Sequence, residues 1–74
     1  MAAHSPAVSR AVAALNALAR ASDGLTLSEL ARETGEPKST LHGILATLVE
    51  AGLLVRDGAT KRYRLGPHLL ALAG

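Results

Sequence analysis

The sequence predicts a single, mainly α-helical domain with a small β-hairpin near its end. Its 74 residues are enough for one small domain. Hydrophobic residues make up 49% of the chain, yet Tyr63 is its one aromatic residue. Alanine and leucine supply most of the apolar side chains, and both favour helices, whereas sheets favour β-branched and aromatic residues. This composition argues against an all-β fold and against the aromatic base-stacking surfaces of RNA-recognition domains.

The first helix is predicted to run from Pro6 to about Ala21, with Ser5 as its N-cap residue. The run Ser22-Asp23-Gly24 then breaks it. Apolar residues at helical spacing form one stripe along it: Val8, Ala11, Val12, Leu15, Leu18 and Ala19. This stripe fits either a core helix or a helix that also packs on a second copy of the chain.

The second helix is predicted to begin after Thr26, which forms a capping box with Glu29. Gly35 stops this helix after Thr34, and Pro37 can open the next helix in its first turn. Two helices joined by such a short, glycine-containing turn have the geometry of a helix-turn-helix motif.

The third helix is predicted over residues 37–51 and ends at Gly52. Its apolar stripe consists of Leu41, Ile44, Leu45, Leu48 and Val49. The opposite face carries small and polar residues, among them Ser39 and Gly43, with no carboxylate before Glu50. This face therefore has nothing near its N-terminal end that would repel a polyanion.

A β-hairpin is predicted next. Its parts are a strand at 53–56, a turn at 57–60 and a returning strand at 61–65. The pair Asp57-Gly58 is typical of hairpin turns. Because side chains alternate along a strand, Arg62 and Arg64 share one face and Tyr63 lies on the other. With a last helix starting after Gly66, the order of elements predicts a winged helix-turn-helix: a three-helix core plus a two-stranded wing.

Positive charge gathers in the second half of the chain. The net charge is +2, but residues 38–74 hold five of the eight Lys and Arg residues and two of the six acidic ones. Four of those five cations lie between Arg56 and Arg64. Such a cluster fits either a phosphate-binding patch or a solvated, charged hairpin.

Several other functional classes lack their residues. The chain has no cysteine, which excludes disulfides and thiolate zinc sites. The histidines His4, His42 and His68 share no metal-ligand spacing, and no nucleophile–base pair points to an enzyme. We also find neither a membrane-spanning apolar run nor a secretory signal. We therefore expect a soluble, intracellular, non-enzymatic domain without cofactor or metal.

Four runs of residues carry a family resemblance. They are Leu25–Ala31, Thr34–His42, Leu45–Gly52 and Tyr63–Pro67. With these runs, Val8 to Leu72 resembles the N-terminal DNA-binding domain of the IclR family of bacterial transcription regulators. The most specific parts are Pro37-Lys38-Ser39-Thr40 followed by His42, and Tyr63-Arg64-Leu65-Gly66.

The resemblance implies a sequence-specific, double-stranded DNA-binding domain over residues 1–74. Its core would span residues 6–66, and residues 67–74 would start a linker helix to an absent C-terminal effector-binding domain. It further implies a homodimeric repressor or activator in the bacterial cytoplasm, at the nucleoid, with a small-molecule effector acting through that absent domain. The recognition helix 37–51 would enter the major groove, and the wing 56–64 would contact the backbone or minor groove. The alternative function is a winged helix that binds another protein and no nucleic acid.

The resemblance and the charges together predict the DNA contacts. On the third helix they are Lys38, Ser39, Thr40, His42, Gly43 and Thr47, and in the wing they are Lys61, Arg62 and Arg64. Ser39 and Thr40 either read bases or only cap the helix. Lys38 anchors a phosphate or is simply solvated. His42 reaches DNA or packs beside the helix, and Thr47 contacts the backbone or only the solvent.

Three further residues are left with alternatives. Family members commonly carry a long polar residue where this chain has Gly43, so the glycine either allows close backbone approach to DNA or removes a contact. Arg56 can pair with Asp57 across the hairpin turn instead of binding phosphate. Tyr63 fits a core position that closes the hairpin better than a base-stacking platform.

Overall fold

The structure, a computed structural model, describes residues 5–73. His4 and the two ends of the expected domain, residues 1–4 and 74, lie outside the described residues. The elements are α1 (Pro6–Ala19), β1 (Leu25–Thr26), α2 (Leu27–Thr34), α3 (Lys38–Glu50), β2 (Leu54–Arg56), β3 (Arg62–Leu65) and α4 (Pro67–Ala73). This is the winged helix-turn-helix that the order of sequence elements predicts. No helix within residues 5–73 is long and apolar enough to cross a membrane.

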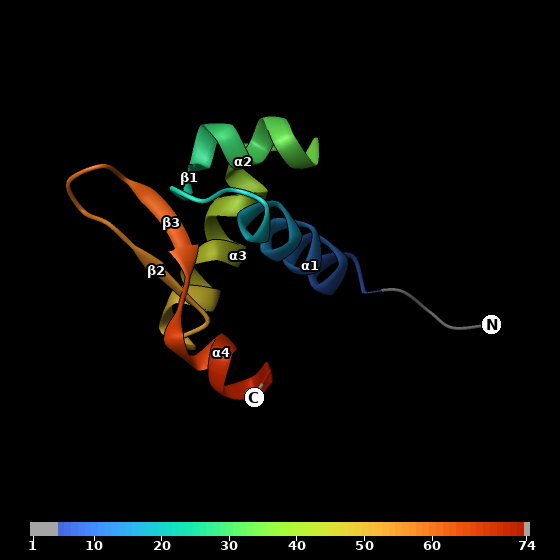
Figure 1. The fold of residues 1–74 in the computed structure, drawn as a ribbon. Coiled ribbons are helices and arrows are strands. Elements are labelled where there is room, and N and C mark those ends of the chain that lie inside the picture. Colours follow the sequence, from blue (N-terminus) through green and yellow to red (C-terminus); the bar gives the residue numbers. More distant parts are fainter. Residues whose placement is uncertain (1–4, 74) are drawn as a thin grey trace.

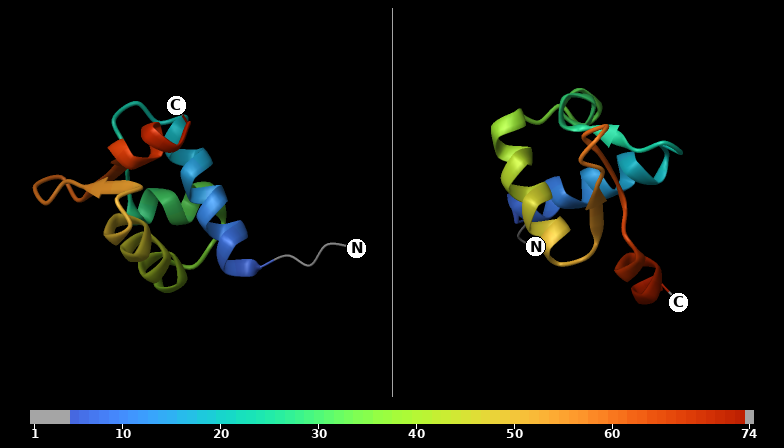
Figure 2. Two further views of the ribbon diagram at one scale, coloured as in Figure 1. Left: turned by 90° about the horizontal axis from the view of Figure 1, so that it is seen from below. Right: turned by 90° about the vertical axis from the view of Figure 1, so that its left-hand side faces the viewer.

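The helices α1, α2 and α3 pack against one another, and the hairpin of β2 and β3 projects from this body as a wing (Figure 1). The left view of Figure 2 shows the tip of the hairpin standing clear of the helices. The sheet has three strands in the order β1-β3-β2, all antiparallel. The predicted wing had two strands. The strand β1 was not predicted, because two residues that pair with a strand far along the chain leave no local periodicity.

The core is built from alanine and leucine around a single ring. Its buried residues are Ala14, Ala17, Leu18, Leu30, Leu41, Leu45, Leu54 and Tyr63. Tyr63 is 5% exposed, which confirms the core interpretation of this residue.

The predicted stripe of α1 is wrong at its two valines and at Ala19, which are exposed. Val8 and Val12 are 61% and 48% exposed, whereas Ala14 and Ala17 are buried. Small alanine side chains let α1 approach its neighbouring helices closely. The face of α1 that carries Ala14 and Ala17 is therefore buried, and the face that carries the valines is exposed. The helix also ends at Ala19, before the predicted end, because the last turn tightens into backbone hydrogen bonds between residues three apart.

The helix-turn-helix forms as predicted from its capping residues. The Thr26 hydroxyl accepts a hydrogen bond from the Glu29 amide (3.2 Å), and the Glu29 carboxylate accepts one from the Thr26 amide (2.9 Å). Gly35 ends α2 with φ +75°. An ion pair of 2.8 Å between Arg10 of α1 and Glu36 holds the turn against the first helix. Pro37 is the N-cap of α3, just outside the helix rather than in its first turn.

Candidate nucleic-acid interface

The first turn of α3 presents polar groups to solvent. Lys38 and Ser39 are exposed, and Thr40 is half-buried. The N-cap residue Pro37 has no side-chain acceptor for the amides of this turn. Helix N-termini with open amides carry partial positive charge and favour anions. The start of α3 is therefore suited to contact a phosphate or the edge of a base.

A groove separates the wing from the helix-turn-helix. Its volume is about 380 Å³, and it is lined by Thr26, Leu27, Ser28, His42, Arg56, Thr60, Lys61 and Tyr63. Among the predicted contacts, it brings together His42 of α3 and Lys61 of the wing. The groove is also lined by three polar residues that were not among the predicted DNA contacts: Ser28, Arg56 and Thr60. We call this space the wing groove.

Arg56 does not pair with Asp57, contrary to the alternative raised from the sequence. Its guanidinium carbon lies 5.9 Å from the centroid of the Tyr63 ring, within the range of a cation–π contact. The Asp57 carboxylate instead accepts hydrogen bonds from the amides of Ala59 (2.8 Å) and Thr60 (3.3 Å). These backbone hydrogen bonds lower the pKa of Asp57 below its ordinary value of 3.8. Asp57 therefore organises the hairpin turn, and Arg56 turns toward the ring.

Arg62 ties the wing to the start of α2. Its Nη1 donates to the backbone oxygen of Gly24 (3.0 Å) and to the carboxylate of Glu29 (3.2 Å), and the side chain is half-buried. The Thr26 amide lowers the pKa of Glu29 most, and the nearby Arg62 charge lowers it further. Arg64 shares this outer face of the wing and is exposed. The two arginines predicted as equivalent contacts thus have different surroundings.

Lys61 has a backbone conformation that favours glycine. Its φ is +61°, and Lys61 is the one non-glycine residue with positive φ in the described part of the chain. The Lys61 amide donates to the backbone carbonyl oxygen of Asp57 (2.7 Å), and the Asp57 amide donates to the backbone carbonyl oxygen of Arg62 (2.8 Å). Lys61 therefore belongs to the turn, and β3 starts at Arg62, one residue later than predicted.

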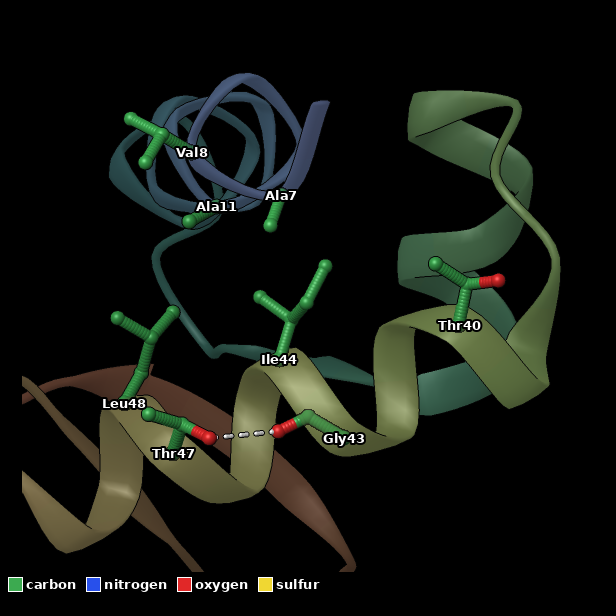
Figure 3. Close-up of a pocket in the computed structure, with 8 residues that line it drawn as sticks. All are labelled: Ala7, Val8, Ala11, Thr40, Gly43, Ile44, Thr47 and Leu48. Atoms are coloured by element: carbon green, nitrogen blue, oxygen red, sulfur yellow. Dashed lines mark hydrogen bonds between the residues drawn. The ribbon is translucent and has the colours of Figure 1, made fainter. Parts of the chain in front are cut away.

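A second groove, of about 390 Å³, separates α1 from α3. It is lined by Ala7, Val8, Ala11, Thr40, Gly43, Ile44, Thr47 and Leu48 (Figure 3). Three predicted DNA contacts, Thr40, Gly43 and Thr47, lie along it and apart from the wing groove. The Thr47 hydroxyl donates to the Gly43 oxygen (3.0 Å), and a Cβ added at Gly43 would meet no atom within 4 Å.

The predicted contacts therefore divide into four places: the start of α3, the wing groove, the α1–α3 groove and the outer face of the wing.

The position of Arg56 in the wing groove could have been predicted from strand pairing. Arg56 lies directly opposite Tyr63 in the hairpin, so both side chains share the face turned toward the helices. Within residues 5–73, no three His, Asp or Glu side chains gather as a metal site.

Comparisons with known proteins identify relatives of this arrangement. Residues 7–58 match the family described as the IclR helix-turn-helix domain. The chain is 43% identical to the glycerol operon regulatory protein of Streptomyces coelicolor, over 97% of this chain and 28% of that protein. The HTH-type transcriptional regulator Rv1719 of Mycobacterium tuberculosis is 35% identical over 89% of this chain and 26% of its own. The chain thus spans little more than a quarter of the length of these relatives.

Solved structures agree with the sequence matches. An IclR transcriptional regulator from Alicyclobacillus acidocaldarius superposes with a TM-score of 0.89 at 34% identity, covering 95% of this chain and 28% of that one. The repressor BlcR of Agobacterium tumefaciens superposes with a TM-score of 0.80 at 43% identity, covering 92% of this chain and 27% of that one.

Proposed function

This chain belongs to the IclR helix-turn-helix domain family, and on that premise we propose that it binds double-stranded DNA sequence-specifically as part of a transcription regulator. The helix α3 enters the major groove, and the wing, residues 56–64, contacts the backbone or the minor groove. The observation that carries this proposal is the first turn of α3, which has no carboxylate and in which Lys38 and Ser39 are exposed. His42, in the next turn of α3, lines the groove that holds two cationic side chains.

Each predicted contact has a role in this proposal. Ser39 and Thr40 read base edges from the first turn of α3, because hydroxyl groups can donate to or accept from bases. Lys38 anchors a phosphate, and the exposed position of its side chain supports this role. His42 contacts DNA from the wing-groove side of α3. Gly43 and Thr47, farther along α3, lie next to the bound duplex.

In the wing, Lys61 and Arg64 contact phosphates, and both are exposed. Arg62 contributes a weaker phosphate contact. Its Nη1 is already engaged with Gly24 and Glu29, but an arginine has five N–H donors, so others remain for DNA.

The test combines a selection with two variants. Bound duplexes are first selected from a random DNA pool, and the selected sequence is then used in fluorescence anisotropy titrations over a range of salt concentrations. The Ser39→Ala/Thr40→Ala variant should lose base preference but keep its affinity for unselected duplex. The Arg62→Gln/Arg64→Gln variant should bind every sequence more weakly and show a flatter salt dependence. Ser22→Ala, in the exposed turn after α1, is the matched control.

Two results would contradict the proposal. If the wild-type chain selects no sequence and shows no salt-dependent binding, the domain is not a DNA-binding module. That result would favour the alternative, a module that binds another protein. If the Ser39→Ala/Thr40→Ala variant keeps the wild-type base preference, these two residues do not read the bases.

The family relationship also supports proposals about the whole protein. We propose a homodimeric, cytoplasmic regulator without enzymatic activity, associated with the bacterial nucleoid, in which α4 begins a linker to a C-terminal effector-binding domain. The exposed Val8 and Val12 on α1 support contact between two copies. Sedimentation of the full-length protein tests the dimer, and a monomer at micromolar concentration would contradict it.

A further inference from the structure

We propose that the wing groove is a binding site for one backbone phosphate of DNA, formed by Ser28, His42, Arg56 and Lys61. The inference rests on the proposed DNA-binding function and deepens it, because it assigns the contact to the inner side of the wing. Of the three wing contacts predicted from the sequence, Arg62 and Arg64 lie on the outer face of the wing, whereas Lys61 lines this groove.

The charges lining the groove select an anion. Arg56 and Lys61 are both exposed cations, and the eight lining residues include no aspartate or glutamate. The two flanking carboxylates are engaged elsewhere. Glu29 accepts from the Thr26 amide and from Arg62, and Asp57 accepts from amides of its own turn. The groove therefore attracts a negative group without competition from its own side chains.

Arg56 is held with its donors available. The contact with Tyr63 uses the face of the aromatic ring and occupies none of the arginine N–H groups. No hydrogen bond or ion pair within residues 5–73 involves the Arg56 guanidinium. Because the ring is buried, it forms a fixed platform for the cation. A guanidinium positioned in this way can donate two parallel hydrogen bonds to a phosphate.

Lys61 supplies the second cation from a strained position. A positive φ is unfavourable for a lysine, and glycine or asparagine would adopt it more readily. The hydrogen bonds of the turn fix this backbone conformation. The Cα of Lys61 is therefore held at the edge of the groove, and its side chain extends from a fixed position. Strain of this kind gathers at functional sites, where a side chain is needed despite its cost.

His42 and Ser28 complete the site from the opposite wall. His42 lies on α3, and Ser28 lies in the first turn of α2, so both helices of the helix-turn-helix border the groove. A phosphate seated here is contacted by the wing and by the helix-turn-helix together. Such a contact fixes how deeply α3 enters the major groove, which is the positioning role of phosphate contacts.

The test uses single-charge variants in anisotropy titrations with a labelled duplex of mixed sequence. Arg56→Gln and Lys61→Asn should each weaken binding about tenfold, the scale of one charge-assisted hydrogen bond. Each should also reduce the slope of log K against log salt by about one. Arg56→Lys and Lys61→Arg should retain most of the affinity. Arg20→Gln, an exposed arginine outside the groove, is the matched control and should change neither quantity by as much.

Lys61→Gly separates binding from folding. This variant relieves the positive-φ strain, so it should melt at a higher temperature than wild type while binding DNA more weakly. A loss of affinity together with a gain of stability cannot come from partial unfolding, and it would support the phosphate site directly.

The inference is overturned if Arg56→Gln and Lys61→Asn both keep the wild-type affinity and salt slope. In that case an NMR titration with inorganic phosphate alone identifies whether the groove holds a free ion instead. Failure of the groove is distinguishable from failure of the proposed function. If the groove is wrong but the domain binds DNA, Arg64→Gln still weakens binding and the Ser39→Ala/Thr40→Ala variant still relaxes base preference.

Discussion

Replacing Gly43 by alanine should stabilise the domain. Gly43 lies inside α3, where alanine is favoured over glycine by about 1 kcal/mol because it loses less backbone entropy. A Cβ at this position would meet no atom within 4 Å, so no steric cost offsets that gain. For a domain of this size, about 1 kcal/mol raises the melting temperature by roughly 4–8 °C.

Thermal unfolding followed by circular dichroism measures the effect, with Gly35→Ala as the matched control. Gly35 is equally open to a Cβ but has φ +75°, so alanine there should destabilise the domain by about 1 kcal/mol. The two variants add the same methyl group and should shift the melting temperature in opposite directions. If Gly43→Ala lowers the melting temperature, the space beside α3 is not open, and the inferred geometry of the α1–α3 groove is wrong.

The same variant distinguishes the two roles considered for Gly43 at DNA. If glycine allows close backbone approach, alanine should weaken binding despite the gain in stability. We expect instead that Gly43→Ala leaves DNA affinity unchanged and that Gly43→Arg tightens it, because the open space accommodates a long side chain that can reach a phosphate. Unchanged affinity of Gly43→Arg would mean that this position points away from the duplex.

Three further predictions concern the wing and α2. Thr26→Ala removes the hydrogen bond from the Glu29 amide to the Thr26 hydroxyl and should cost about 1 kcal/mol in chemical denaturation, whereas Thr26→Ser should cost little. Arg62→Gln should lower the melting temperature more than Arg64→Gln, since Arg62 alone bonds Gly24 and Glu29; equal melting temperatures would contradict that. Acid should destabilise the domain, because folding lowers the pKa values of Glu29 and Asp57. Their contribution is present above the ordinary values of 4.5 and 3.8 and is lost as the pH falls through the lower folded-state values. Urea titrations from neutral to acid pH should show this loss, and the Glu29→Gln/Asp57→Asn variant should show a weaker pH dependence.

The parts of the fold that depend on neighbouring residues could be predicted from the sequence. The capping box of Thr26 and Glu29 and the stop at Gly35 each involve residues within a few positions of one another, so local chemistry specifies them. The buried face of α1 could not be predicted in the same way. A helix rich in alanine has several faces that can be buried, and the packing of α2 and α3 selected Ala14 and Ala17 over Val8.

The same distinction holds for the candidate site. The start of α3, with Lys38 and Ser39 exposed, follows from the helix-turn-helix pattern. The role of Arg62 depends on Glu29, 33 residues away along the chain, and no sequence period connects the two. The conformation of Lys61 was hidden for another reason. The Asp57-Gly58 pair correctly marked the hairpin, but Asp57 bonds the amides of its own turn and the positive φ falls at Lys61 instead of the glycine.

The shared use of Thr26 has a consequence for how this domain adapts to different operators. Thr26 pairs with Arg62 in the sheet and also caps α2, so no flexible link separates the wing from the helix-turn-helix. The two contacting parts therefore keep a fixed spacing, and a duplex that engages both must adjust its groove width or bend to match. The energy of that adjustment depends on the deformability of each base step. We therefore expect sequence preferences at steps that no side chain touches.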